Sequence, residues 1–179
     1  MRNIAIPHPS EYPSYSSIYM ELLDNDKNIL DQLWDNFLTL KRLIYSLPEE
    51  KLLYRYAEGK WTIKEILVHN IDDERIFSCR AMRFARNDNT PLPGFEQDDY
   101  ARFSQANERG LDDIFEEYEA VRKGTITLFK YLPEESLMRK GFGIDTDGSL
   151  INERTVRAFV YHIAGHELRH MEIIKKRYL

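Results

Sequence analysis

The hydrophobic residues of this chain recur at alternating steps of three and four positions along four separate stretches. This spacing places them on one face of an α-helix and predicts helices that bury that face against one another. Two of the stretches show the pattern as a continuous stripe. The first stripe consists of Leu33, Phe37, Leu40, Ile44 and Leu47, and the second consists of Leu111, Ile114, Tyr118, Val121, Thr125, Leu128 and Leu132.

Helix-ending and helix-capping residues set the limits of the predicted helices. Pro48 and Pro133 follow the two stripes and end those helices, because proline cannot continue a helix. Another helix is expected over residues 62–87, where Thr62 and Glu65 have the spacing of a capping box. The fourth helix is expected to begin near residue 155 and to continue to the end of the chain.

The links between these helices indicate how they are arranged. Residues 48–61 and 133–154 form links of medium length, and the second is rich in glycine and leaves room for a short hairpin. The link over residues 87–110 is long enough to cross the end of a bundle, and we expect it to contain a short helix. Strand patterns are weak everywhere. We therefore predict an all-α, four-helix bundle with a long crossover between helices 2 and 3.

Length favours one domain, and we expect it to span residues 1–179. Residues 1–17 contain Pro7, Pro9 and Pro13 and lack the apolar core of a signal peptide. We expect this segment to be an extended N-terminal arm laid over the bundle.

Charge and composition exclude several classes of function. The formal net charge of −5 gives no electrostatic support for nucleic-acid binding. No apolar run approaches the roughly 20 residues that a membrane span needs. The single cysteine, Cys79, cannot form an internal disulfide, which suits a reducing cytosol, and we expect it to be an ordinary packing residue. A cytoplasmic location follows as an expectation.

Two histidines one helical turn apart are the main candidates for chemistry. His166 and His170 continue the apolar stripe of Phe159 and Ile163 and should face the core of the bundle. Burying two adjacent imidazoles is costly unless each has a partner, which is either a hydrogen-bonding group or a shared metal ion. The i,i+4 spacing lets both rings bind a single divalent metal ion. We favour the metal over a hydrogen-bonded pair in the core.

The letters HELRH also match the zinc-protease signature, with Glu167 in the place of the general base. Such proteases take their third ligand from downstream, and only MEIIKKRYL follows His170 here. A third ligand should therefore come from upstream. His8 lies in the proline-rich arm, so His69 on the second helix is the strongest candidate.

The neighbours of these histidines have roles that the sequence leaves open. His162 lies one turn before His166, on the shoulder of the stripe, and is either a support for the site or a competing ligand. Asp73, one turn after His69, either orients a ligand or is a solvated acid. Glu167 is either a general base or a surface or supporting acid. The remaining acids of this stretch, Asp72 and Glu74, are expected at the surface.

Two segments resemble the DinB/YfiT-like superfamily: GKWTIKEILVHNIDDERIF at 59–77 and VYHIAGHELRHMEIIKKRYL at 160–179. The helix pattern between them fits as well, so the resemblance covers nearly the whole chain from about residue 20. It implies a four-helix bundle with a long crossover and a three-histidine metal site. By this resemblance the metal ligands are His69, His166 and His170, and His162 is not a ligand.

The resemblance also implies a class of activity. The family is a collection of candidate metal-dependent hydrolases and of thiol S-transferases that use low-molecular-weight thiols such as bacillithiol or mycothiol, and several members are known only as stress-associated proteins. We therefore expect a metal-dependent enzyme acting on a small molecule, with zinc or nickel as the ion and iron or manganese as further candidates. The alternative is a non-catalytic, stress-associated binding or scaffold bundle with a structural metal. A homodimer is also expected.

Overall fold

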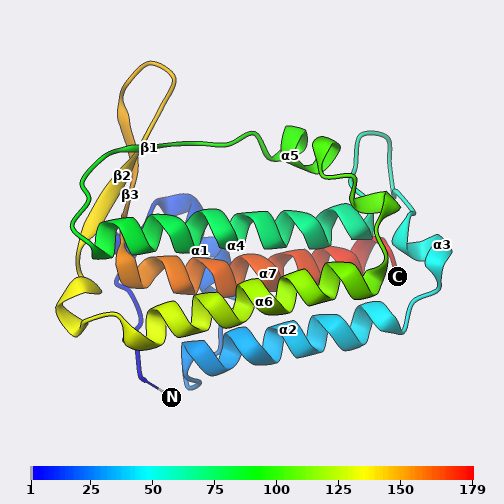
Figure 1. The fold of residues 1–179 in the computed structure, drawn as a ribbon, viewed down its shortest axis with the longest axis horizontal. Coiled ribbons are helices and arrows are strands. Elements are labelled where there is room, and N and C mark those ends of the chain that lie inside the picture. The colour runs from blue at the N-terminus through cyan, green and yellow to red at the C-terminus, as the bar shows by residue number, and fades with distance from the viewer. Residues whose placement is uncertain (1) are drawn as a thin grey trace.

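The computed structural model describes residues 2–179, in which four long helices lie side by side (Figure 1). They are α2 (Ile29–Tyr45), α4 (Ile63–Ala85), α6 (Leu111–Tyr131) and α7 (Val156–Arg177). Each corresponds to one of the stretches with helical periodicity. The predicted capping box at the start of α4 is present, since the Thr62 side chain accepts from the Glu65 N–H and the Glu65 side chain accepts from the Thr62 N–H. The predicted all-α, four-helix bundle is confirmed.

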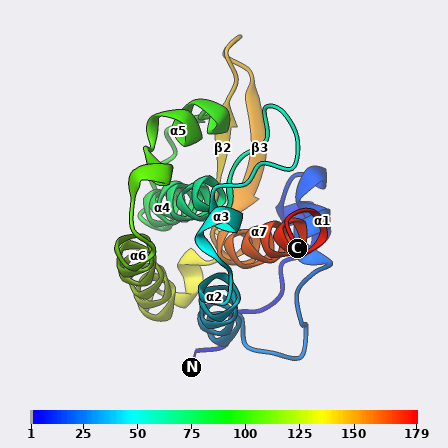
Figure 2. The ribbon, with the colours of Figure 1, turned by 90° about the vertical axis from the view of Figure 1, so that its right-hand side faces the viewer.

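Seen end-on, the bundle is a ring in which α2, α7, α4 and α6 are successive neighbours (Figure 2). Helices α4 and α6 run in one direction, and α2 and α7 run in the other (Figure 1). Because α4 and α6 are parallel and consecutive among the long helices, a long crossover must join them. It returns along the outside of α4 and contains the short helix α5 (Gln97–Phe103). Another short helix, α3 (Glu49–Leu52), lies between α2 and α4.

A small sheet closes one end of the bundle. Strands β2 (Lys140–Ile144) and β3 (Leu150–Thr155) form an antiparallel hairpin in the glycine-rich link. Strand β1 (Leu92–Pro93) comes from the crossover and pairs parallel with β2. The hairpin packs closely on α4, because a Cβ at Gly141 would lie 2.3 Å from the ring of Phe84.

The N-terminal segment packs against α7. Residues 2–8 are irregular, two 3-10 turns follow at Pro9–Glu11 and Ser14–Ser16, and α1 spans Ser17–Met20. The Tyr161 hydroxyl donates a 2.8 Å hydrogen bond to the carbonyl of buried Ile4. A Cβ at Gly165 would lie 2.3 Å from the Tyr19 carbonyl oxygen, so only glycine lets α1 lie this close to α7.

The core consists of two apolar clusters with a layer of buried polar side chains between them. One cluster contains Leu33, Phe77 and Phe159, and the other contains Phe37 and Phe115. The polar layer comes from the middle of α4, α6 and α7. Its members are Glu74, Tyr118, Arg122 and Glu167.

Arg122 is at the centre of this polar layer and is 0% exposed. Its Nη2 lies 2.8 Å from Glu74 Oε2, and its Nη1 lies 2.9 Å from Glu167 Oε2. Burial opposes its charge, but the two carboxylates outweigh burial and raise the pKa of Arg122 well above its usual value. The surface position expected for Glu74 is therefore wrong, because α4 is covered by α6 on this face; Asp72 is half-buried.

Cys79 is not the packing residue that the sequence predicts, because it is exposed on α4. Its thiol is free.

No helix within residues 2–179 combines the length and the apolar character needed to cross a membrane.

Candidate metal centre

The bundle brings together three histidines from two helices. His69 lies near the start of α4, and His166 and His170 lie one turn apart on α7. The Nε2 atom of His166 is 3.3 Å from that of His69 and 3.1 Å from that of His170. One nitrogen from each ring falls within 4.8 Å of the others. His69 and His166 are buried, while His170 is partly exposed at the edge of the site.

Hydrogen bonding among the three rings does not account for this arrangement. A neutral ring nitrogen carries either one proton or one lone pair. His166 Nε2 can therefore form a hydrogen bond in only one of its two contacts, with either His69 or His170. The second contact would then bring two ring nitrogens together with no hydrogen bond between them. Two Nε2 ligands of one tetrahedral zinc ion, each at 2.0–2.1 Å, lie roughly 3.3 Å apart. The separations of 3.1 and 3.3 Å fit a shared divalent ion.

The protonation state of the trio also suits metal binding. Burial, and secondly the neighbouring His166, lower the pKa of His69 to about 4. Burial lowers the pKa of His166 to about 4 as well, and burial together with the other two rings lowers the pKa of His170 well below its usual value. All three imidazoles are neutral at pH 7. Neutral imidazoles offer the lone pairs that a metal ion requires.

Asp73 supports the trio from behind. Its Oδ2 lies 3.4 Å from His166 Nδ1, on the opposite side of the ring from the converging Nε2 atoms. A carboxylate in this place orients a ligating histidine and makes it more basic. The Nδ1 atoms of His69 and His170 have no hydrogen-bonding partner in residues 2–179. Of the three rings in residues 2–179, only that of His166 has a carboxylate within 4 Å of its Nδ1, and this contact is a close approach without a hydrogen bond, because Asp73 Oδ2 has no hydrogen-bonding partner either. Burial raises the pKa of Asp73 to about 7.

His162 is buried beyond Asp73 and does not join the trio. Its ring stacks on Phe77, with centroids 4.2 Å apart and planes 1° from parallel, and its Nε2 lies 3.9 Å from Asp73 Oδ2. The ring of Tyr19 packs edge-on against both His162 and His166. His162 is thus a buried neighbour of the site, and Asp73 separates it from the converging nitrogens.

Glu167 points away from the histidines. It is 1% exposed, it accepts a 2.7 Å hydrogen bond from the Tyr118 hydroxyl, and it pairs with Arg122 in the polar layer. A residue held in this way cannot reach a water molecule at the trio. The sequence therefore matches the zinc-protease signature in letters, but the geometry does not place its glutamate at the site.

A pocket of about 290 Å³ opens beside the trio and gives it an entrance. His170 lines it together with Trp61, Asp98 and Tyr178. The Trp61 ring lies 4.6 Å from that of His69, and its Nε1 donates a 3.0 Å hydrogen bond to Asp98 on α5. The crossover thereby forms one wall of the entrance. These wall residues were not singled out from sequence, although Trp61 directly precedes the predicted capping box.

Comparisons with known proteins agree with this architecture. The profile described as the DinB superfamily matches residues 29–174. A protein of Oceanobacillus iheyensis named as a "putative metal-dependent hydrolase" is 28% identical over 137 residues, which cover 76% of this chain and 75% of that protein. The solved structure of YfiT from Bacillus subtilis, titled a "probable metal-dependent hydrolase with an unusual four-helix bundle topology", aligns with a TM-score of 0.67 at 12% identity, covering 96% of this chain and 92% of that one. At this identity the YfiT match shows the fold.

Proposed function

The chain belongs to the DinB superfamily, and from that premise we propose that it is a metal-dependent enzyme acting on a small molecule. The proposal assigns one divalent ion to His69, His166 and His170. The observation that carries it is the convergence of three neutral Nε2 atoms at separations that fit a shared ion. Three protein ligands leave coordination positions open, which is typical of catalytic sites. We expect zinc or nickel, with iron or manganese as further candidates.

The residues around the trio supply binding, orientation and exclusion of water. Asp73 lies 3.4 Å behind Nδ1 of His166, where its carboxylate would orient the ring with its Nε2 towards the other two histidines. Trp61 and Tyr19 cover the rings and lower the local dielectric constant. The pocket beside His170 admits a small substrate to the open side. The bound ion would activate water for hydrolysis or stabilise the thiolate form of a thiol.

Hydrolysis is the first candidate reaction, and the printed names of the two relatives support it. Transfer of a low-molecular-weight thiol to a small electrophile is the second. The position of Glu167 favours the second candidate, because the carboxylate that would deprotonate water is bound by Arg122 and Tyr118. A thiol has a pKa near 8.5 and reaches its reactive thiolate form more readily than water reaches hydroxide.

Two assay arms on the metal-reconstituted protein test the proposal and separate the two reactions. One arm follows hydrolysis of a panel of activated esters and amides. The other follows consumption of bacillithiol or cysteine in the presence of a small electrophile. Turnover that disappears on chelation and returns with zinc or nickel, in either arm, is expected.

His8→Ala is the matched control, because His8 is exposed and lies outside the site. It should keep full activity, whereas His166→Ala should lose it. Full metal occupancy without turnover in either arm would instead support the non-catalytic scaffold, in which the metal only stabilises the fold.

Three coarser expectations belong to the same proposal. We propose that residues 1–179 act as one domain, with residues 1–17 as its N-terminal arm. We propose a cytoplasmic location on the basis of the single free cysteine. A homodimer is supported by large exposed apolar side chains, such as Phe103 at 74% and Tyr131 at 71% exposure.

A further inference from the structure

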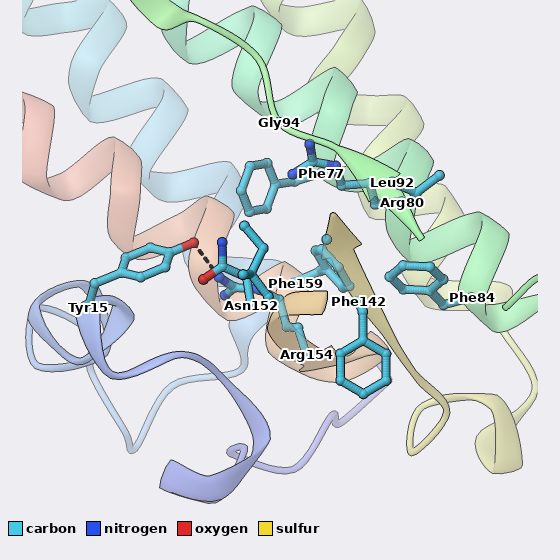
Figure 3. A pocket seen from close by; sticks show the side chains of 12 residues that line it. Tyr15, Phe77, Arg80, Phe84, Leu92, Gly94, Phe142, Asn152, Arg154 and Phe159 are labelled. Atoms are coloured by element: carbon cyan, nitrogen blue, oxygen red, sulfur yellow. Dashed lines mark hydrogen bonds between the residues drawn. The ribbon is translucent and has the colours of Figure 1, made fainter. Parts of the chain in front are cut away.

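A second pocket, of about 60 Å³, lies where the β2–β3 hairpin meets the bundle (Figure 3). It is separate from the histidine site. Arg80, which lines it, follows His69 by about three turns of α4, or roughly 16 Å along the helix axis. The stacked rings of Phe77 and His162 stand between the two sites.

The charge of this pocket is one-sided. Its lining includes two arginines, Arg80 on α4 and Arg154 on β3, and no aspartate or glutamate. Both guanidinium groups pack on the same ring, with their Cζ atoms 5.2 Å and 5.5 Å from the centroid of Phe77. Neither arginine forms an ion pair within residues 2–179, although the charge of buried Asp73, which lies outside the lining, acts on both. Two like charges held beside one ring favour an anion between them.

Of the two arginines, Arg154 gives the stronger evidence for an anion site. It is 2% exposed, and its Nη2 donates 3.0 Å hydrogen bonds to the hydroxyls of Tyr15 and Ser16. Its Nη1 is buried and has no partner in the described part of the chain. The rings of Phe77 and Phe159 offset part of the desolvation cost through cation–π contacts. They do not satisfy the unpaired N–H groups, and burial lowers the pKa of Arg154.

The hairpin is shaped to hold Arg154 in this place. The β2–β3 pairing shifts register between Gly141 and Gly143, and Asn152 opposite adopts a left-handed conformation with φ of 54°. A bulge of this kind redirects the side chains that follow it, and bulges are frequent beside functional sites. Figure 3 shows Arg154 and Arg80 reaching the pocket from different elements, with the Tyr15 hydroxyl hydrogen-bonded to Arg154.

We propose that this pocket binds the oxyanion group of a small molecule, a carboxylate or a phosphate, between Arg80 and Arg154. Guanidinium groups bind such groups through paired, charge-assisted hydrogen bonds. The volume is enough for about four water molecules, which matches one oxyanion group and leaves the rest of the ligand outside. The proposal is independent of the metal-dependent activity.

Calorimetric titration of the full chain with inorganic phosphate and with benzoate, at constant ionic strength, tests this site. Saturable binding of at least one of the two anions is expected, and which one binds distinguishes a phosphate site from a carboxylate site. Arg80→Gln and Arg154→Gln should each weaken binding by at least tenfold. Arg86→Gln is the matched control, because Arg86 is exposed at the end of the same helix and carries the same charge.

His166→Ala separates this site from the trio, since an anion could also bind a metal ion there. Binding should be unchanged in His166→Ala. No saturation by either anion up to about 10 mM would overturn the proposal. So would equal affinity in Arg80→Gln and the unaltered chain, or loss of binding in His166→Ala. If Arg154→Gln does not fold by circular dichroism, Arg80→Gln alone decides the outcome.

Discussion

Among single residues, two buried histidines on α7, His162 and His166, have different environments. His166 has its Nε2 beside two other imidazole nitrogens and its Nδ1 beside Asp73. The nitrogens of His162, by contrast, have no hydrogen-bonding partner in residues 2–179, and its ring is covered by Phe77. Convergence of lone pairs, and not burial, therefore distinguishes a proposed ligand from a supporting side chain.

Replacement of His69 tests whether the ligand from α4 is required. His69→Ala should lower bound metal from about one equivalent to less than a tenth, because two ligands on one helix turn do not complete the site. Elemental analysis after reconstitution measures this. His8→Ala should retain full occupancy, and full occupancy in His69→Ala would remove this histidine from the ligand set.

Replacement of Asp73 tests the orienting contact. Asp73→Asn keeps the shape of the side chain but removes its charge behind His166. Metal affinity should fall by about 10- to 100-fold, the usual effect of altering such a partner, while the stoichiometry at saturation stays the same. Competition with a chromophoric chelator gives the affinity. An unchanged affinity would assign Asp73 no part in the site.

The sequence predicted the members of the trio on different grounds. The i,i+4 spacing paired His166 with His170, whereas His69 was chosen because His8 lies in the arm and because the family resemblance points to it; the fold brings the three together. The positions of Glu74 and Cys79 were misjudged because a single stripe does not tell which other helix faces are covered. Helix α4 touches α5, α6 and α7, so Glu74 is enclosed while Cys79 remains exposed.

Among the elements, the polar layer joins the middles of three helices. Glu74 on α4, Arg122 on α6 and Glu167 on α7 meet with no access to solvent. A buried ion group of this kind contributes little net stability, but we infer that it fixes the helices in one register, because a slip would leave charges unpaired. Glu167 directly follows His166 on α7. The contact between Glu167 and Arg122 therefore also constrains the rotation of α7 at the histidine site.

Loss of the central cation should therefore be severe. Arg122→Met leaves two buried carboxylates without a partner and should lower the free energy of unfolding by about 3–5 kcal/mol. Urea unfolding followed by circular dichroism measures the change. Arg86→Met, on the exposed end of α4, should stay within about 0.5 kcal/mol of the unaltered chain. A similarly small effect in both variants would mean that the layer carries no structural constraint.

Helix limits and strand pairings differed in how far the sequence could predict them. The ends of the four helices depend on local signals, such as Pro48, Pro133 and the Thr62 capping box, and the structure has them near the predicted places. The sheet depends on pairing between β1 in the crossover and β2 in a distant link. Nothing local specifies that partner, so the three-stranded sheet could not be predicted beyond a short hairpin.

At the level of the whole molecule, one contact ties the N-terminal segment to the start of α7. Glu11 Oε2 lies 2.7 Å from Arg157 Nε and accepts a 2.9 Å hydrogen bond from the Thr155 hydroxyl. These partners lower the pKa of Glu11 from 4.5 to about 2, with the Arg157 hydrogen bond as the main cause. The carboxylate also lies at a helix N-terminus, where negative charge is favourable. The segment in turn holds Tyr19 against the histidine site.

This lowered pKa makes the attachment dependent on pH. The contribution of Glu11 to stability is fully present above about pH 4.5 and is lost as the pH falls through 2, because the unfolded state binds the proton more readily. After allowance for solvent screening the contribution is about 1 kcal/mol or less. Glu11→Gln should be less stable than the unaltered chain at pH 6, and the difference should vanish near pH 2 in urea unfolding. A constant difference across this range would contradict the assignment.

The most direct measurement of the central site is anomalous diffraction from crystals of the zinc-loaded chain, collected on both sides of the zinc absorption edge. We expect one strong anomalous peak per chain, at about 2.0–2.1 Å from the Nε2 atoms of His69, His166 and His170, with at least one coordination position not filled by protein. A zinc peak elsewhere, or none at the trio despite full loading in solution, would contradict both the metal site and the metal-dependent activity proposed for it.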